Sequence, residues 1–188
     1  MHTTTRNPRG FTLVELLMTL AVLAILTACA APAFGNLISS TGARASRSNL
    51  IAALNTARIF AASKTAQVVV CPSADGQYCG HTTEWQHGWL IFIDADRDNA
   101  RDDGEDLLAV GEKQPDGVAI LSTAGRTHVD YRPDGSATGS NVTFTVCDRR
   151  GASDATALVI NNAGRVRAGE PTPAAAAACV TVLDGPGA

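Results

Sequence analysis

The sequence has little of what metal-dependent and nucleic-acid-binding proteins usually contain. It has only four histidines in 188 residues and no Cys-x-x-Cys pair, so the common zinc patterns are missing. Lysine and arginine number 15 against 18 aspartate and glutamate residues, and loss of residues 1–10 would change the formal charge from -3 to -5. Any attraction to nucleic acid must therefore be local.

Recognisable catalytic patterns are also missing. The sequence contains no glycine-rich phosphate loop, and its serine, histidine and aspartate residues form no nucleophilic motif. Trp85, Trp89 and Phe92 are best explained as core residues of β-structure, because aromatic side chains in strands bury well. We therefore expect neither an enzyme nor a cofactor.

Charged residues are absent from 16–43, and this gap follows an isolated acid, Glu15. As a helix, residues 11–31 would be about 31 Å long, which is the thickness of a hydrocarbon core. Ala28-Cys29-Ala30 resembles a secretory cleavage site, and residues 26–29 resemble a lipoprotein cleavage box, so both are alternatives. Neither explains Glu15, since an acid in an apolar segment requires a cationic partner.

A cut between Gly10 and Phe11 would supply that partner, as a new amino group one helical turn from Glu15. The stretch Gly10-Phe11-Thr12-Leu13-Val14-Glu15 resembles the type IV prepilin signature. The resemblance implies that prepilin peptidase cuts after Gly10, that Phe11 becomes the N-methylated terminus, and that Glu15 aligns the subunit with other pilins. It also implies a single-pass inner-membrane precursor with a periplasmic globular domain, followed by assembly into an extracellular pilus.

Four segments are expected along the chain. Residues 1–10 form the leader, 11–33 the transmembrane and assembly helix, 34–63 the second half of the N-terminal helix, and 64–188 a β-rich globular domain. One helical face is apolar and should cover a sheet; it consists of Leu50, Leu54, Ala57 and Ala61. We expect Gly35 and Gly42, after Pro32, to loosen the helix between its two halves.

Short β-rich runs divided by Gly, Asp and Pro follow the helix. The expected strands are 67–71, 88–93, 118–122, 127–131, 142–147, 156–161 and 179–183, and the Ala/Pro tract 171–178 is expected to be a spacer before the last. The fold class is therefore α+β and type IV pilin-like, with a long N-terminal helix packed on antiparallel sheet.

Four of the five cysteines lie in the polar part of the chain, and they are Cys71, Cys79, Cys147 and Cys179. In an exported domain they predict two disulfide bonds, for which three pairings are possible. We favour Cys71 with Cys79 and Cys147 with Cys179, because the first pair closes a short local loop. A metal site is the weaker alternative.

Several stretches resemble the FimT/GspH branch of minor pilins and pseudopilins. They are Trp85-x-x-Gly88-Trp89, Asp103-Gly104-Glu105, Tyr131-Arg132-Pro133-Asp134-Gly135, Cys147-Asp148-Arg149-Arg150-Gly151 and Gly164-Arg165-Val166-Arg167. The resemblance implies a subunit of a type IV pilus or, as the alternative, a structural pseudopilin of a type II secretion system.

The last of these stretches predicts binding of double-stranded DNA. In an extended chain, Arg165 and Arg167 lie on the same side about 6.8 Å apart, roughly the rise of two phosphates along one strand. FimT-like minor pilins of naturally transformable bacteria contact DNA through a Gly-Arg-x-Arg motif, which this sequence matches from Gly164 to Arg167. The simpler alternative is a turn glycine followed by a solvated strand face.

Other arginines could enlarge this patch if the sheet brings them near. Residues 120–170 contain six arginines and no lysine, against five acids. Arg149 and Arg150 are included in the predicted DNA site, and Arg126 and Arg132 are further candidates. Such contacts would be independent of base sequence and sensitive to salt, because they are made to phosphates.

An acidic stretch has the spacing of a calcium loop. Its oxygen ligands would be Asp94, Asp96, Asp98, Asp102 and Glu105, at positions 1, 3, 5, 9 and 12. Position 6, normally glycine, is Asn99, which tolerates the left-handed conformation. Arg101 at position 8 departs from the pattern, so the alternative is an acidic, solvated turn without an ion.

Overall fold

The computed structural model describes residues 10–185, except for the side chain of Pro32. The predicted leader, apart from Gly10, therefore lies outside the described residues. The chain divides into two compact units, Met1–Leu37 and Ile38–Ala188.

Helix α1, Leu13–Lys64, spans the predicted membrane segment and the predicted second half without interruption. The prediction that Gly35 and Gly42 loosen the helix is therefore wrong. A glycine in a helix interior costs only about 1 kcal/mol, and the alanine and leucine residues around these positions favour helix. The first part of α1 is long and apolar enough to cross a membrane, and none of it is buried in the protein.

From Ile38 onwards α1 carries the face that supports the globular unit. Leu50, Leu54, Ala57 and Ala61 are all fully buried, which confirms the predicted face. They share one hydrophobic core with Phe144 and Tyr131, which lie in strands, and with Trp85, which lies in a loop. The aromatic residues predicted to lie in the core, Trp85, Trp89 and Phe92, are also buried.

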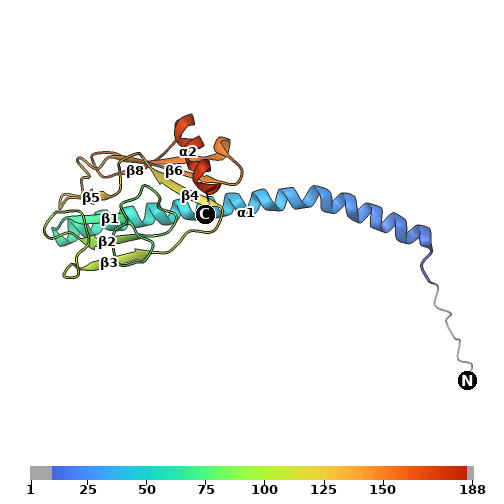
Figure 1. Ribbon diagram of the computed structural model, residues 1–188, viewed down its shortest axis with the longest axis horizontal. Helices are drawn as coiled ribbons and strands as arrows, with labels where there is room; N and C mark the ends of the chain where they lie inside the picture. The colour runs from blue at the N-terminus through green and yellow to red at the C-terminus, as the bar shows by residue number, and fades with distance from the viewer. Residues whose placement is uncertain (1–9, 186–188) are drawn as a thin grey trace, which may run out of the picture. The chain divides into compact units, whose positions relative to one another are not determined.

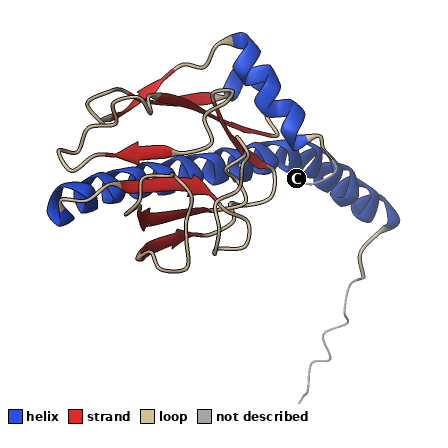
Figure 2. Cartoon of the chain, turned by 60° about the vertical axis from the view of Figure 1, so that its left-hand side comes forward, coloured by secondary structure: helices blue, strands red, loops and turns tan. Residues whose placement is uncertain are grey.

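Two four-stranded antiparallel sheets lie along this part of α1 (Figures 1 and 2). Sheet A has the order β3-β2-β1-β5, with β1 Val68–Pro72, β2 Trp89–Ile93, β3 Leu107–Gly111 and β5 Val129–Tyr131. Sheet B has the order β4-β6-β7-β8, with β4 Val118–Ser122, β6 Val142–Asp148, β7 Thr156–Ile160 and β8 Val166–Gly169. A short 3-10 helix, Ala152–Asp154, connects β6 to β7.

The carboxyl-terminal segment differs from the prediction. Residues 179–183 are not a strand and 171–178 are not a spacer, because helix α2 runs over Pro173–Leu183. Thr172 caps this helix by accepting a hydrogen bond from the backbone N–H of Ala175, and Pro173 occupies its first turn. Five consecutive alanines then favour helix so strongly that the β-branched residues after them continue it.

The two disulfide bonds join Cys71 to Cys79 and Cys147 to Cys179, which are the pairings favoured from the sequence. The first lies on the face of sheet A that points away from α1, beside Val69 and Leu90. The second attaches α2 to sheet B, where Cys179 is fully buried. Each disulfide therefore anchors an outer segment to a sheet.

The globular unit contains its own core. Among the described residues, every buried side chain lies between Ser40 and Cys179. A segment of about 150 residues buries enough apolar surface to be stable alone. The unit Ile38–Ala188 can therefore be expected to fold without the apolar first part of α1.

Candidate nucleic-acid interface

Two turns, one after β5 of sheet A and one after β7 of sheet B, contact each other next to the predicted DNA-binding arginines. The first follows β5, where the N–H of Gly135 donates to the carbonyl of Arg132 over 2.7 Å. The second connects β7 to β8, where the N–H of Gly164 donates to the carbonyl of Asn161 over 2.8 Å. The N–H of Ala137 then donates to the carbonyl of Asn162 over 3.0 Å, which joins the two turns.

Gly164 is buried at the contact between these turns. Its φ of 72° lies in the left-handed region, where a side chain costs about 1–2 kcal/mol. A Cβ here would also overlap the carbonyl oxygen of Gly135 and lie 3.2 Å from Cε1 of Tyr131. Only glycine therefore fits at the position that precedes Arg165.

Arg58 of α1 contacts both turns. Its Nε donates to the carbonyl oxygen of Gly135 over 2.9 Å, and the same atom lies 3.3 Å from where a Cβ on Gly164 would be. The nearby Tyr131 is fully buried, and burial raises the pKa of its hydroxyl despite the opposing charge of Arg58. No local pattern reveals this contact in the sequence, since 77 positions separate Arg58 from Gly135.

Arg165 and Arg167 flank Val166 at the start of β8, an edge strand of sheet B. Val166 packs against the core, so the two arginines point to the opposite face, and both are exposed. The backbone N–H of Arg165 donates to the side-chain oxygen of Asn161, which fixes the entry into β8. Neither guanidinium forms an ion pair with any of the described residues.

Arg149 and Arg150 do not join this pair. They follow the end of β6, next to the start of β7, whereas Arg167 is opposite Val159 and therefore near the other end of both strands. About five residues of strand, or roughly 17 Å, separate the two ends. Of these two arginines, Arg149 is exposed, but Arg150 is already bound to carboxylates.

Arg150 holds a buried carboxylate in a bidentate arrangement. Its Nε and Nη2 donate to the two oxygens of Asp148 over 2.9 and 2.7 Å, and its Nη1 donates to Asp154 over 2.8 Å. Burial alone would raise the pKa of Asp148, but the hydrogen bonds and charge of Arg150 outweigh it, and the pKa is lowered. Arg150 is thus a structural residue.

Arg132 and Arg126 lie at the same end of sheet B as the pair. Arg132 is exposed in the turn that contacts Gly164. Arg126 donates from Nη1 to the carbonyl of Gly139, in the loop that precedes β6, so it lies at the same end of sheet B as Arg165. The structure therefore places Arg126 and Arg132, rather than Arg149 and Arg150, at the same end of sheet B as the predicted DNA-binding arginines.

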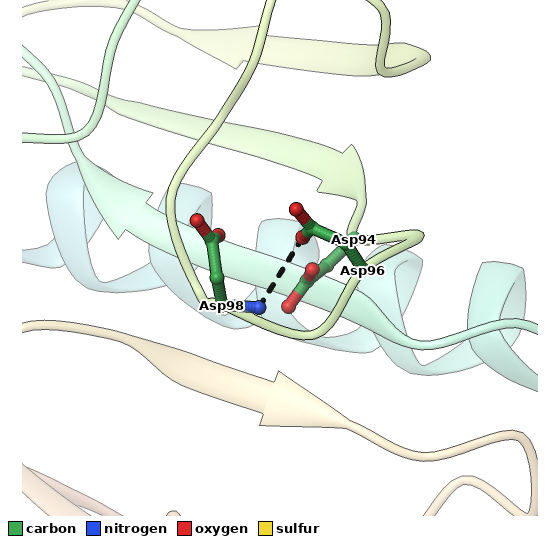
Figure 3. Close-up of side chains that lie close together, drawn as sticks. All are labelled: Asp94, Asp96 and Asp98. Carbon is green, nitrogen blue, oxygen red and sulfur yellow. Dashed lines mark hydrogen bonds between the residues drawn. The ribbon is translucent and has the colours of Figure 1, made fainter.

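The predicted calcium loop follows β2, and three of its five ligands come together (Figure 3). Oxygens of Asp94, Asp96 and Asp98 lie within 4.8 Å of one another. Asn99 adopts the left-handed conformation, with φ of 62°, as expected at position 6. Asp102 and Glu105 are not part of this group.

Hydrogen bonds already order this acidic loop. Asp94, whose pKa is raised by burial, accepts bonds from the N–H groups of Arg97 and Asn99 and from Gln67. Glu105 accepts from Ala95 and Asp102 instead of facing the three aspartates. Calcium binding therefore stays a hypothesis, to which these hydrogen bonds add only that the loop is ordered by its own contacts.

The predicted processing and assembly residues lie at the start of α1. Gly10 and Phe11 precede the helix, and Phe11 is exposed. Glu15 accepts hydrogen bonds from the N–H and the hydroxyl of Thr12, while its own N–H donates to the Thr12 hydroxyl, each over 3.3 Å. This is a capping box, and the Thr-x-x-Glu spacing could have revealed it in the sequence.

Comparison with known families identifies the globular unit. The profile of a family described as type II transport protein GspH matches residues 47–164, more than half of the chain. The chain belongs to the GspH family. A prokaryotic N-terminal methylation motif also matches residues 5–30, which include Gly10, Phe11 and Glu15. This GspH-family protein is therefore a minor pilin or pseudopilin, a class of structural proteins that associate in filaments.

Two solved structures of a minor pilin support the pilin-like fold. Two crystal structures of the type IV minor pilin FimU from Pseudomonas aeruginosa align with 73% and 70% of this chain and 91% and 92% of theirs. Their sequence identities are 19% and 20%, and their TM-scores are 0.54 and 0.52. The minor pseudopilin EpsH from the type 2 secretion system of Vibrio cholerae aligns with 69% of this chain and 98% of its own, at 11% identity and a TM-score of 0.48. No curated protein matches the sequence significantly.

Substitution of Gly164 should destabilise the joint between the turns. We expect Gly164→Ala to lower the free energy of unfolding by about 3 kcal/mol, from backbone strain and overlap with Gly135 together. Gly125→Ala is the matched control, since Gly125 has a φ of 76° but open space around it, and it should cost about 1 kcal/mol. Urea unfolding of residues 38–188 measures both, and equal losses would show that the contact is unimportant.

Substitution of Arg150 should destabilise the fold much more than substitution of its neighbour Arg149. Arg150→Ala leaves Asp148 buried without its cation and should cost roughly 3 kcal/mol at pH 7, whereas Arg149→Ala should change stability by less than about 0.5 kcal/mol. Because the folded-state pKa of Asp148 is lowered, its stabilising contribution is present at neutral pH and is lost as pH falls through that pKa. The free energy of unfolding, measured at pH 7 and at about pH 3, should therefore show a smaller difference between Arg150→Ala and the parent protein in acid. A difference that does not change with pH would contradict this.

Proposed function

We propose that this GspH-family protein is a minor pilin of a type IV pilus that binds extracellular double-stranded DNA through Arg165 and Arg167. Its role is to hold DNA during uptake for natural transformation. The observation that carries the proposal is a pair of exposed arginines at the start of an edge strand, neither of which forms an ion pair with a described residue. They follow a glycine that fits against the neighbouring turn.

The geometry suits contacts with phosphates. Arg167 lies in β8 and Arg165 directly precedes it, so in an extended backbone their side chains leave the chain about 6.8 Å apart, close to two nucleotide steps along one DNA strand. A guanidinium with free N–H groups binds a phosphate in a bidentate manner, and no carboxylate of the described residues competes for either arginine. Arg132 and Arg126 add positive charge at the same end of sheet B.

Duplex DNA fits this surface better than a single strand. Proteins that hold single strands usually stack the bases on exposed aromatic side chains. Among the described residues, the largely exposed aromatics are Phe11, Phe34 and Tyr78, and none of them belongs to the two turns or to β8. The surface therefore offers charge to a backbone, which predicts binding that is independent of sequence and weak in each subunit. Several copies in one filament would add avidity.

A structural pseudopilin of a type II secretion system is the second candidate function. The observation that favours it is the description of the matching family as type II transport protein GspH; the match ends at residue 164, before Arg165 and Arg167. In that case the arginines are a solvated strand face. Deletion of the gene separates the two functions, since loss of transformation with intact secretion supports DNA uptake and the opposite result supports secretion.

The DNA proposal predicts a defined loss of affinity. Arg165→Ala with Arg167→Ala, introduced into residues 38–188, should abolish most duplex binding and lower the slope of log K against log salt by about two. Gel shift or fluorescence anisotropy at low and moderate salt measures both quantities.

Arg149→Ala is the matched control, because it removes an exposed arginine at the other end of sheet B. It should leave the affinity nearly unchanged. Equal effects of the two changes would mean that general charge, and not the β8 pair, attracts DNA. If the double variant binds like the parent protein, the proposed DNA site is eliminated.

Processing by prepilin peptidase is part of the proposed function. The N-terminal methylation motif and the exposed Gly10–Phe11 junction support it. Mass spectrometry of the protein from its native membrane should find a chain that begins at N-methylated Phe11. An acylated Cys29 at the terminus would instead indicate a lipoprotein, and Gly10→Val should leave the full precursor in the membrane.

A further inference from the structure

We propose that Arg58 is a positioning residue for DNA binding, because it locks the two turns that hold Arg165 and Arg167 against helix α1. This inference rests on the proposed function and extends it to a residue that does not itself need to contact DNA. Arg58 lies on α1, in a part of the sequence with no other relation to the arginine motif.

The carbonyl oxygen of Gly135 is the centre of the arrangement. Gly135 is buried. Its carbonyl oxygen accepts a hydrogen bond of 2.9 Å from the Nε of Arg58, and among the described residues it has no other donor. A buried carbonyl without a donor loses the free energy of a hydrogen bond. Without Arg58, the turn would therefore move to expose this oxygen to water.

That movement would reach the DNA site directly. The same oxygen lies against Gly164, close enough that no Cβ fits between them, and Gly164 is bonded to Arg165 in the chain. The turn from Asn161 to Gly164 is further tied to the first turn by the hydrogen bond from Ala137 to Asn162. A shift of Gly135 thus changes where β8 begins and where Arg165 and Arg167 point.

Substitution of Arg58 by lysine distinguishes a positioning role from an effect of its positive charge alone. Arg58 is half-buried and uses Nε, the donor nearest its aliphatic stem. Lysine retains the positive charge but has no N–H at that place. Arg58→Lys should therefore fail to restore what Arg58→Met removes, whereas a residue that acts only through its charge would be restored.

The first readout does not involve DNA. In residues 38–188, amide hydrogen exchange at Gly164 and Ala137 reports the hydrogen bonds within and between the two turns. We expect exchange at both amides to accelerate roughly tenfold in Arg58→Met and in Arg58→Lys, from loss of one charge-assisted hydrogen bond. Arg44→Met is the control, because Arg44 is exposed on the same helix. Unchanged exchange in the Arg58 variants would overturn the proposal.

The second readout is duplex affinity. We expect both Arg58 variants to bind roughly tenfold more weakly with an unchanged salt slope, and to cause no further loss in an Arg165→Ala, Arg167→Ala background. An additive loss with a slope lower by about one would make Arg58 a phosphate contact and overturn the positioning role. If the parent protein binds no DNA, the proposed function fails, and the exchange measurement still decides whether Arg58 orders the turns.

Discussion

The contact between Gly164 and the carbonyl of Gly135 determines where the candidate site lies. One turn follows a strand of sheet A and the other leads into a strand of sheet B, so the start of β8 depends on both sheets. The contact requires a residue without a side chain, in a left-handed conformation. It also explains why two stretches that resemble the FimT/GspH branch, Tyr131 to Gly135 and Gly164 to Arg167, belong together, since they form one structural unit.

Whether an arginine is available to bind DNA depends on its position in the fold and on the bonds it already forms, and not on how many arginines the segment contains. Residues 120–170 are rich in arginine, but Arg150 is bound by Asp148 and Asp154, and Arg126 donates to a backbone carbonyl. A guanidinium that already pairs with a buried carboxylate would have to leave it uncompensated to bind a phosphate, at considerable cost. Arg165 and Arg167 form no ion pair within residues 10–185, so they are the better candidates for binding an external anion.

Local patterns predicted the parts of the fold that depend on local chemistry. Helical spacing identified the buried face from Leu50 to Ala61, and the separation of eight residues between Cys71 and Cys79 favoured their disulfide bond. The prediction of a strand over residues 179–183 is wrong because it rests on their β-branched side chains alone. The alanine run before them, capped at Thr172, starts a helix that continues through these residues. The Arg58 contact and the separation of Arg150 from Arg167 depend on sheet register, and no short stretch of sequence contains that information.

Glu15, in the first turn of α1, has one partner in the described chain and would gain a second after the proposed cut. In the chain that still carries Gly10, the carboxylate of Glu15 accepts bonds from the N–H and hydroxyl of Thr12, so its negative charge also meets the positive end of the helix dipole. These contacts offset part of the cost of an acid at the edge of an apolar segment. The proposed cut after Gly10 adds a full positive charge at Phe11, next to Thr12. In the proposed filament, the Phe11 amino group of a neighbouring subunit would have to compete with this capping box for Glu15. These hydrogen bonds are exposed and 3.3 Å long, so they would exchange for such an ion pair at little cost.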